Sequence, residues 1–167
     1  MPDQAMPPAR PEPGRSADLP AVNLPAADLP AADVHRRLVE LYPQLLATGQ
    51  FDAGLALIDP DVIDHRGGTD GDHRGRAAWR QKWERLAAGG YGVTGMSVTV
   101  EQNVAAGDIS VNRYISRGTD PVTGRSYAVT SMDMVRVRDG RVVEHWAVMD
   151  STARRHQLSA AAPAPAP

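Results

Sequence analysis

An aspartate and a histidine on neighbouring predicted strands are the residues of this sequence best suited to proton-transfer chemistry. Asp133 stands in an apolar strand, where a carboxylate is costly unless it has a partner. Asp139-Gly140 fits a three-residue hairpin loop, whose pairing would set Asp133 opposite His145. A two-residue turn would set Asp133 opposite Trp146 instead. A facing Asp–His pair can fix the imidazole tautomer or shift a pKa, so it predicts a general acid–base site, with a purely structural pair as the alternative.

His65 is a second candidate acid–base residue. It ends the short apolar run 61–65 and would lie at the rim of a pocket, where it could transfer a proton or donate a hydrogen bond to a substrate. A loop histidine that caps the backbone is the alternative. The segment 61–73 is rich in Asp and His, but its spacing matches neither an EF-hand nor a zinc-binding helix. We therefore expect a solvated acidic loop and no metal site.

Four further side chains are candidate substrate-binding residues. In the predicted strand 109–117, Arg113 and Tyr114 point to opposite faces, and no tight turn fixes which of them faces the pocket. On the pocket side, Arg113 could orient a carboxylate or stabilise an oxyanion. In the last hairpin, Ser131 is expected to face Ala147 across the same ladder.

The fold that positions these residues is predicted to begin with helices. Apolar residues at three- and four-residue steps predict a helix over 31–48, with Pro43 as a kink or break. A short second helix stops at Asp59-Pro60, and a polar loop follows over 61–74. A third helix is predicted over 75–88, closed by the glycines that follow it.

Trp79 and Trp83 lie on one face of the third helix. They either pack in the core or form the floor of a pocket, where they would be substrate-binding residues.

Strands are predicted to follow the helices. Apolar residues then alternate with a period of two, which predicts strands over 96–104, 109–117, 126–137 and 141–149. This order predicts an α+β fold in which N-terminal helices pack over a curved, mostly antiparallel sheet and enclose a pocket.

Composition limits the class of protein. The 167 residues carry 18 basic and 20 acidic side chains in a mixed pattern and no cysteine, which argues against disulfides, thiol nucleophiles and a nucleic-acid surface. No apolar run is long enough to span a membrane, so no membrane partner and a cytoplasmic location are expected. Eight of the 14 prolines fall in residues 1–30. We expect a disordered leader over 1–30, one domain over 31–157 and a disordered tail over 158–167.

Several short stretches are informative as a set because of their order along the chain: Val62-Ile-Asp-His65, Gly75-Arg-Ala-Ala-Trp79, Ala106-Gly-Asp108, Arg117-Gly-Thr119 and Asp133 to Trp146. Together they resemble the SnoaL-like polyketide cyclase branch of the nuclear-transport-factor-2-like (NTF2-like) superfamily. The segment Asp139 to Trp146 is the most specific, and the resemblance covers roughly residues 34–152. It implies an α+β cone with a deep apolar pocket, usually dimeric, that closes polyketide rings by aldol chemistry without metal or cofactor.

The resemblance also implies a place for the acid–base aspartate. In the aldol cyclases of this family it directly follows the His-Trp pair, and that position is Ala147 here. The facing strand often carries a histidine, and the matching position here is Asp133. The position of the family's aspartate thus carries no carboxylate here, and the facing strand carries one instead, at Asp133.

These observations predict a cofactor-independent acid–base enzyme of secondary metabolism, such as antibiotic biosynthesis. Its substrate would be a hydrophobic small molecule of the polyketide type, in which it closes a ring. Epoxide opening or hydroxylation on the same fold is one alternative, and non-catalytic binding of a small molecule is another. A homodimer is expected from the apolar side chains assigned to the outer face of the last hairpin: Met132, Met134, Val142 and Trp146.

Overall fold

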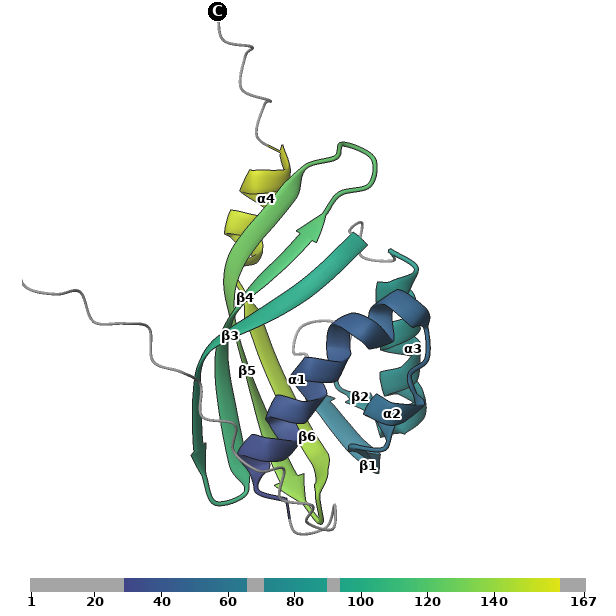
Figure 1. Cartoon of the computed structure of the whole chain (residues 1–167), viewed down its shortest axis with the longest axis vertical. Helices are drawn as coiled ribbons and strands as arrows, with labels where there is room; N and C mark the ends of the chain where they lie inside the picture. Colours follow the sequence, from purple (N-terminus) through teal and green to yellow (C-terminus); the bar gives the residue numbers. More distant parts are fainter. Residues whose placement is uncertain (1–28, 66–70, 90–93, 160–167) are drawn as a thin grey trace, which may run out of the picture.

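The computed structural model of the chain describes residues 29–65, 71–89 and 94–159, which place a layer of helices against one curved sheet (Figure 1). The elements are, in chain order, α1 (Ala31–Thr48), α2 (Asp52–Leu55), β1 (Ile58–His65), β2 (His73–Arg74), α3 (Gly75–Ala87), β3 (Thr94–Ala106), β4 (Ile109–Thr119), β5 (Ser126–Arg138), β6 (Arg141–Met149) and α4 (Ser151–Ser159). The described strands form a six-stranded sheet in the order β2-β1-β6-β5-β4-β3. Every neighbouring pair is antiparallel except β1 and β6. The predicted α+β class is therefore confirmed.

Helix α1 crosses the concave face of the sheet and buries its apolar stripe there. Val34, Leu38 and Leu45 are buried in the main core, together with Trp79 and Trp83 of α3. Pro43 lies inside α1 without ending it, so of the two predicted alternatives, a kink or a break, the break does not occur. The helix ends at Gly49, whose left-handed backbone (φ 70°) lets its N–H donate to the Leu45 carbonyl oxygen. Both long helices lie where the hydrophobic spacing predicts them.

Strand β1 corrects the sequence-based assignment of 55–74 as a short helix followed by a polar loop. Helix α2 is only one turn long, and β1 begins three residues after it. Ile58 and Val62 of β1 are buried in the main core, because the strand lies in the sheet beside β6. The ladder between β1 and β6 shifts register between Ile58 and Ile63, the stretch that contains Pro60. The proline is therefore accommodated at an irregularity of the strand.

The β5–β6 hairpin has a two-residue turn, so the predicted three-residue loop is wrong. Arg138 pairs with Arg141, and Asp139 and Gly140 both have positive φ (48° and 67°), as a type I′ turn requires. Between the pairs 136–144 and 137–142, β6 carries one extra residue, Val143, which forms a bulge. The turn and the bulge together change the residues that face one another.

The register places Asp133 opposite Ala147 and His145 opposite Val135, in place of the predicted Asp133–His145 and Ser131–Ala147 pairs. Directly paired residues share a face of the sheet, so Asp133 and His145 still lie on one face as diagonal neighbours. Val142 was assigned to the outer face, but it is fully buried because it precedes the bulge and pairs with the core residue Val137.

The ends of the chain are described only in part. Of the predicted leader 1–30, residues 1–28 lie outside the described residues, and Leu29 packs against the main core. Helix α4, which was not predicted, packs Ala153 and Leu158 against Tyr127 and Val129 of β5. The predicted tail lies outside the described residues from residue 160 onward. None of the described helices is long and apolar enough to cross a membrane.

Candidate active site

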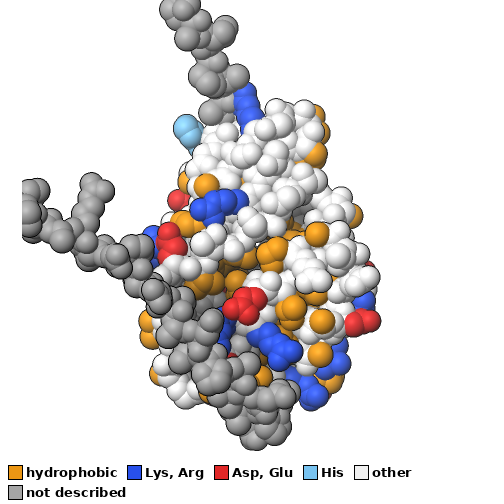
Figure 2. All heavy atoms as spheres, viewed as in Figure 1, with side chains coloured by type: hydrophobic (Ala, Val, Ile, Leu, Met, Phe, Trp, Pro, Cys, Tyr) orange, Lys and Arg blue, Asp and Glu red, His pale blue; other side chains and the backbone are white. Residues whose placement is uncertain are grey.

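A cavity of about 190 Å³ lies between the concave face of the sheet and the helices α1 and α3. Hydrophobic side chains gather between these two layers in the space-filling view (Figure 2). Apolar and aromatic residues dominate the lining, as is usual for small-molecule sites. Polar side chains from six different elements face the same space. The polar and charged lining residues are His35, Tyr42, Lys82, Ser97, Tyr114, Ser116, Asp133 and His145.

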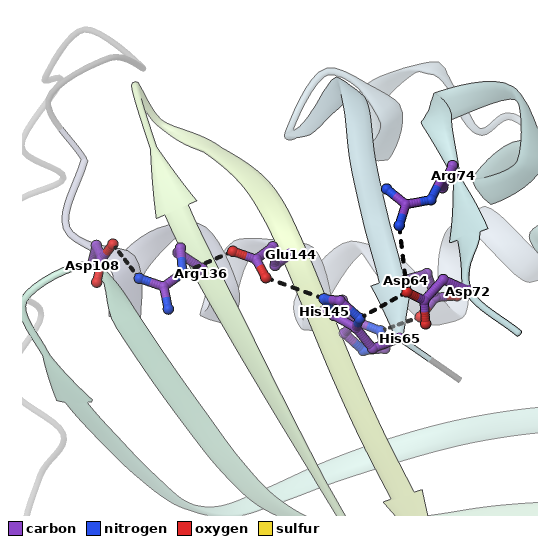
Figure 3. A network of polar contacts seen from close by, with 8 residues as sticks. All are labelled: Asp64, His65, Asp72, Arg74, Asp108, Arg136, Glu144 and His145. Atoms are coloured by element: carbon purple, nitrogen blue, oxygen red, sulfur yellow. Dashed lines mark hydrogen bonds and ion pairs between the residues drawn. The ribbon is translucent and has the colours of Figure 1, made fainter. Parts of the chain in front are cut away.

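The first polar group is an Asp–His pair formed where β1 runs parallel to β6. Asp64 and His145 are register partners, and Asp64 Oδ1 lies 2.6 Å from His145 Nδ1 (Figure 3). Lys82 of α3 donates from Nζ to the other carboxylate oxygen at 2.9 Å. The same ammonium lies 4.0 Å from the centre of the Trp79 ring, and His145 meets that ring edge-on. His145 is therefore held by Asp64 and the Trp79 ring, and Lys82 contacts both of these groups.

The electrostatics of this pair leave the imidazole neutral and the carboxylate ionised. Burial lowers the pKa of His145, although the hydrogen bond that its ring donates to Asp64 acts in the opposite direction. Burial alone would raise the pKa of Asp64, but the bonds from His145 and Lys82 hold it well below its usual range. An ionised Asp64 accepts the Nδ1 proton, so the Nε2 atom of His145 carries the lone pair. This is the tautomer of a general base.

The second polar group pairs Asp133 with His35, a residue of α1 that the sequence analysis did not select. His35 is 1% exposed, and its Nε2 lies 3.2 Å from Asp133 Oδ2. The Asn112 amide lies 2.8 Å from the same nitrogen, and Ser110 Oγ lies 3.0 Å from Nδ1. Asn103 donates to both of these side chains. The ring is therefore fixed by a buried network, which in turn fixes the carboxylate.

Tyr114 completes the polar lining. It is the partner of Ser131 across the β4–β5 ladder, next to the Asn112–Asp133 pair. Burial, and then the nearby Asp133 carboxylate, raise the pKa of the Tyr114 phenol. The phenol therefore stays protonated at neutral pH and can donate a hydrogen bond.

The structure thus gives Asp133 and His145 different partners from those predicted. Both residues line the cavity, but Asp133 pairs with His35 and His145 pairs with Asp64. Of the candidate substrate-binding residues, those that line the cavity are Trp79, Trp83, Tyr114 and Ala147. Ser131 is buried beside Tyr114.

His65 lies on the outer face of the sheet, away from the predicted pocket rim. Its ring stacks on Trp146, with 4.6 Å between ring centres. Its two nitrogens lie 3.2 Å from Asp72 and 3.1 Å from Glu144, within a chain of ion pairs that Figure 3 follows to Asp108. Because adjacent residues of a strand point to opposite faces, His65 faces away from the cavity that its neighbour Asp64 approaches.

Arg113 also lies on the outer face. It pairs across the ladder with Met132 and forms an ion pair with Glu101 of β3. Its side chain is 43% exposed and does not line the cavity. The register therefore decides the question that the strand pattern left open, and the expected role of Arg113 in orienting a pocket carboxylate is wrong.

Three residues of the site were missed: His35, Asp64 and Lys82. His35 stands in the apolar stripe of α1, between Val34 and Leu38, and that position was a usable signal of burial. Lys82 follows Trp79 by three residues and therefore shares its side of α3, which was also a usable signal. Asp64 gave no such signal, because its role depends on the parallel pairing of β1 with β6.

A helical layer over a curved sheet, with acid–base side chains facing an apolar cavity between them, defines an NTF2-like protein. The family model of the SnoaL-like domain matches residues 39–145. The chain therefore belongs to the SnoaL-like family.

Several solved structures are similar to this chain. IdmH from Streptomyces antibioticus, named as a candidate polyketide cyclase, is 29% identical, with 78% of this chain and 99% of that chain covered and a TM-score of 0.66. TsrD from Streptomyces laurentii is 24% identical, with 77% and 97% covered and a TM-score of 0.63. A SnoaL-like candidate polyketide cyclase from Jannaschia sp. CCS1 is 18% identical, with 79% and 93% covered and a TM-score of 0.65. The last two show the fold alone. The comparison with curated proteins gives no match.

Proposed function

We propose that this protein is a cofactor-independent acid–base enzyme that closes a ring in a hydrophobic, polyketide-type intermediate of secondary metabolism. One observation carries the proposal: two separate His–Asp pairs, His145–Asp64 and His35–Asp133, face a single apolar cavity. A reaction that removes a proton at one atom and delivers one at another needs two such groups. A binding site for an apolar ligand alone needs neither.

His145 is the base of the proposed reaction. Its neutral ring takes a proton from the carbon next to a substrate carbonyl, and Asp64 stabilises the imidazolium that forms. The electron pair left on carbon forms a bond to a second carbonyl carbon of the same molecule. The new alkoxide then takes a proton from the site, so that one carbon–carbon bond forms and a proton moves from carbon to oxygen. No oxidant or reductant is consumed.

Asp133 and Tyr114 hold the oxygen side of the substrate. The protonated phenol of Tyr114 can donate to a carbonyl oxygen as negative charge develops there. Asp133 lies on the adjacent strand and can exchange a proton with the product hydroxyl. The apolar walls hold a flexible chain in a folded, reactive conformation, which lowers the entropic part of the barrier. The name of the relative IdmH supports a cyclase, at 29% identity.

Turnover of poly-β-ketone precursors, followed by mass spectrometry, tests the proposal. We expect a cyclic product with the mass of the precursor, or that mass less one water, and no metal or cofactor requirement. His145→Gln should lower kcat by about 10²- to 10⁴-fold while circular dichroism stays unchanged. Incorporation of ¹⁸O from labelled water would instead indicate epoxide opening or hydroxylation. Tight binding without conversion would indicate a non-catalytic binder.

A further inference from the structure

The charges around the cavity are unevenly compensated. Among the described lining residues, Lys82 carries the only permanent positive charge, and it bonds to the ionised Asp64 beneath it. His145 is neutral because burial lowers its pKa. Asp133 has the His35 imidazole as its partner, and it forms no ion pair with a lysine or arginine among the described residues. A ligand with a carboxylate or phosphate would therefore enter a cavity that offers it no uncompensated cation.

Asp133 also has unused hydrogen-bonding capacity. An ionised carboxylate can accept about four hydrogen bonds, and the contact of Asp133 in the described residues is that of Oδ2 with His35. Oδ1 is buried and has no partner there. An unpaired buried acceptor is costly, so a donor from a bound ligand would be favoured at this carboxylate.

The surfaces around Asp133 are aromatic and apolar. Tyr42 lines the cavity from α1, Trp79 and Trp83 line it from α3, and Tyr114 lines it from the sheet. Aromatic rings favour contact with other rings by stacking or edge-to-face packing. A ligand that fills this space is therefore expected to be unsaturated or aromatic, with its polar group placed at the strand that carries Asp133.

We infer that the cavity selects uncharged aromatic or enolic ligands that donate a hydroxyl proton to the Asp133 carboxylate, and that it excludes carboxylates. This inference rests on the proposed function only in taking the cavity as the substrate site. It defines the substrate class as the phenol or enol form of a polyketide-type compound, with the donor hydroxyl left free.

Three naphthalene probes of nearly equal shape test this inference: 2-naphthol, 2-methoxynaphthalene and 2-naphthoate. Binding to the full chain at pH 7 is measured by calorimetry and ligand-observed NMR. The naphthol is neutral and donates a proton, the ether is neutral and cannot donate, and the naphthoate is an anion. We expect the naphthol to bind at least tenfold more tightly than the ether, and the naphthoate to bind most weakly.

A variant pair assigns this preference to one side chain. Asp133→Asn keeps the shape and removes the charge, so the naphthol should lose at least tenfold in affinity, the ether should change little and the naphthoate should gain. Asp108→Asn is the matched control, because Asp108 pairs with Arg136 on the outer face and should leave all three affinities unchanged.

Equal binding of the naphthol and the ether, preferred binding of the naphthoate, no binding of any probe, or an unchanged ranking in Asp133→Asn would overturn the inference. Its failure is distinguishable from failure of the proposed function. A protein that prefers the naphthol but converts no precursor would contradict only the enzymatic proposal. A protein that converts precursors without this preference would contradict only the inference.

Discussion

Asp133 and Ala147 are direct partners across the β5–β6 ladder, and both face the cavity. Directly opposed residues of an antiparallel pair have their Cβ atoms about 5 Å apart. Ala147 is the position at which the aldol cyclases of the family carry their acid–base aspartate, as the sequence resemblance implies. The carboxylate of this protein therefore lies one strand away from that place, on the same face.

This relationship predicts that the carboxylate can be moved across the ladder. Asp133→Ala should lower kcat at least a hundredfold, on the order of a lost acid–base group. Adding Ala147→Asp should recover at least a tenfold part of that loss, since the new carboxylate reaches the same space. Rates are measured on the precursor converted by the wild type, with Ala147→Asp alone as the control. A double variant no faster than Asp133→Ala would contradict this account.

The lowered pKa of His145 predicts the acid limb of the pH profile. A base must be unprotonated, so kcat/KM should be constant near neutrality and fall only below the ordinary histidine value of about 6.5. Asp64→Asn removes the anion that favours the imidazolium, so the pKa of His145 should fall further, because Lys82 also lowers it. The acid limb should then move to lower pH while kcat drops.

His65→Gln is the matched control for this profile, because His65 faces the opposite side of the sheet. Its kcat/KM should stay within about threefold of the wild type, and its acid limb should not move; a threefold change in rate is less than 1 kcal/mol in barrier. An acid limb at or above 6.5 in the wild type, or an upward shift in Asp64→Asn, would argue against His145 as the base.

The Lys82–Asp64 pair should show non-additive effects on stability. Lys82→Met leaves the buried Asp64 carboxylate without its cation and should cost about 3–5 kcal/mol of unfolding free energy. The double variant Lys82→Met, Asp64→Asn should lose less than the sum of the single losses. Urea denaturation at pH 7 measures both. Additive losses would show that the two residues do not stabilise one another.

The same pair sets a pH window for stability. Because the pKa of Asp64 is lowered in the folded chain, its contribution is complete above the unfolded value of about 3.9 and is lost as pH falls below it. Wild type should therefore lose more stability than Asp64→Asn between pH 4 and acid unfolding.

We propose that two copies of the chain associate through the outer face of the sheet. Met132 and Val148 are cross-strand partners there and are 44% and 69% exposed, so they form an apolar pair in solvent. Val148→Lys should convert the dimer to a monomer, as measured by sedimentation velocity. Val122→Lys is the control, because Val122 is 91% exposed in the β4–β5 turn. An unchanged mass for Val148→Lys would exclude this face as the interface.

The predictable parts of the fold are those with a local pattern. Alternation located β3 to β6 to within two residues, and three- and four-residue spacing located α1 and α3. Strand β1 could not be found in this way, because it pairs in parallel with a strand about 80 residues away and contains Pro60. The Asp64–His145 contact depends on that pairing, so the sequence could identify the histidine as a candidate but not its partner.

The predicted register of the last hairpin was wrong for a different reason. Asp139-Gly140 satisfies both a two-residue and a three-residue loop, and the two differ in which residues are opposed. A two-residue turn alone would put Asp133 and His145 on opposite faces, but the bulge at Val143 returns them to one face, so the prediction of a shared face was right although the predicted contact was wrong. His35 could have been predicted as buried, but no local pattern relates α1 to β5.

The bulge at Val143 has a consequence for how sequences of such proteins are compared. The extra residue lies between the turn and His145, and the ladder on either side is regular. A chain that lacked this one residue would still present the same histidine to the cavity, with the turn and the histidine four rather than five positions apart. A search motif with a fixed number of residues between them would miss functional equivalents that differ by a single deletion. An alignment that matches residues by the face of the strand on which they lie, and not by their number of positions after the turn, would recover them.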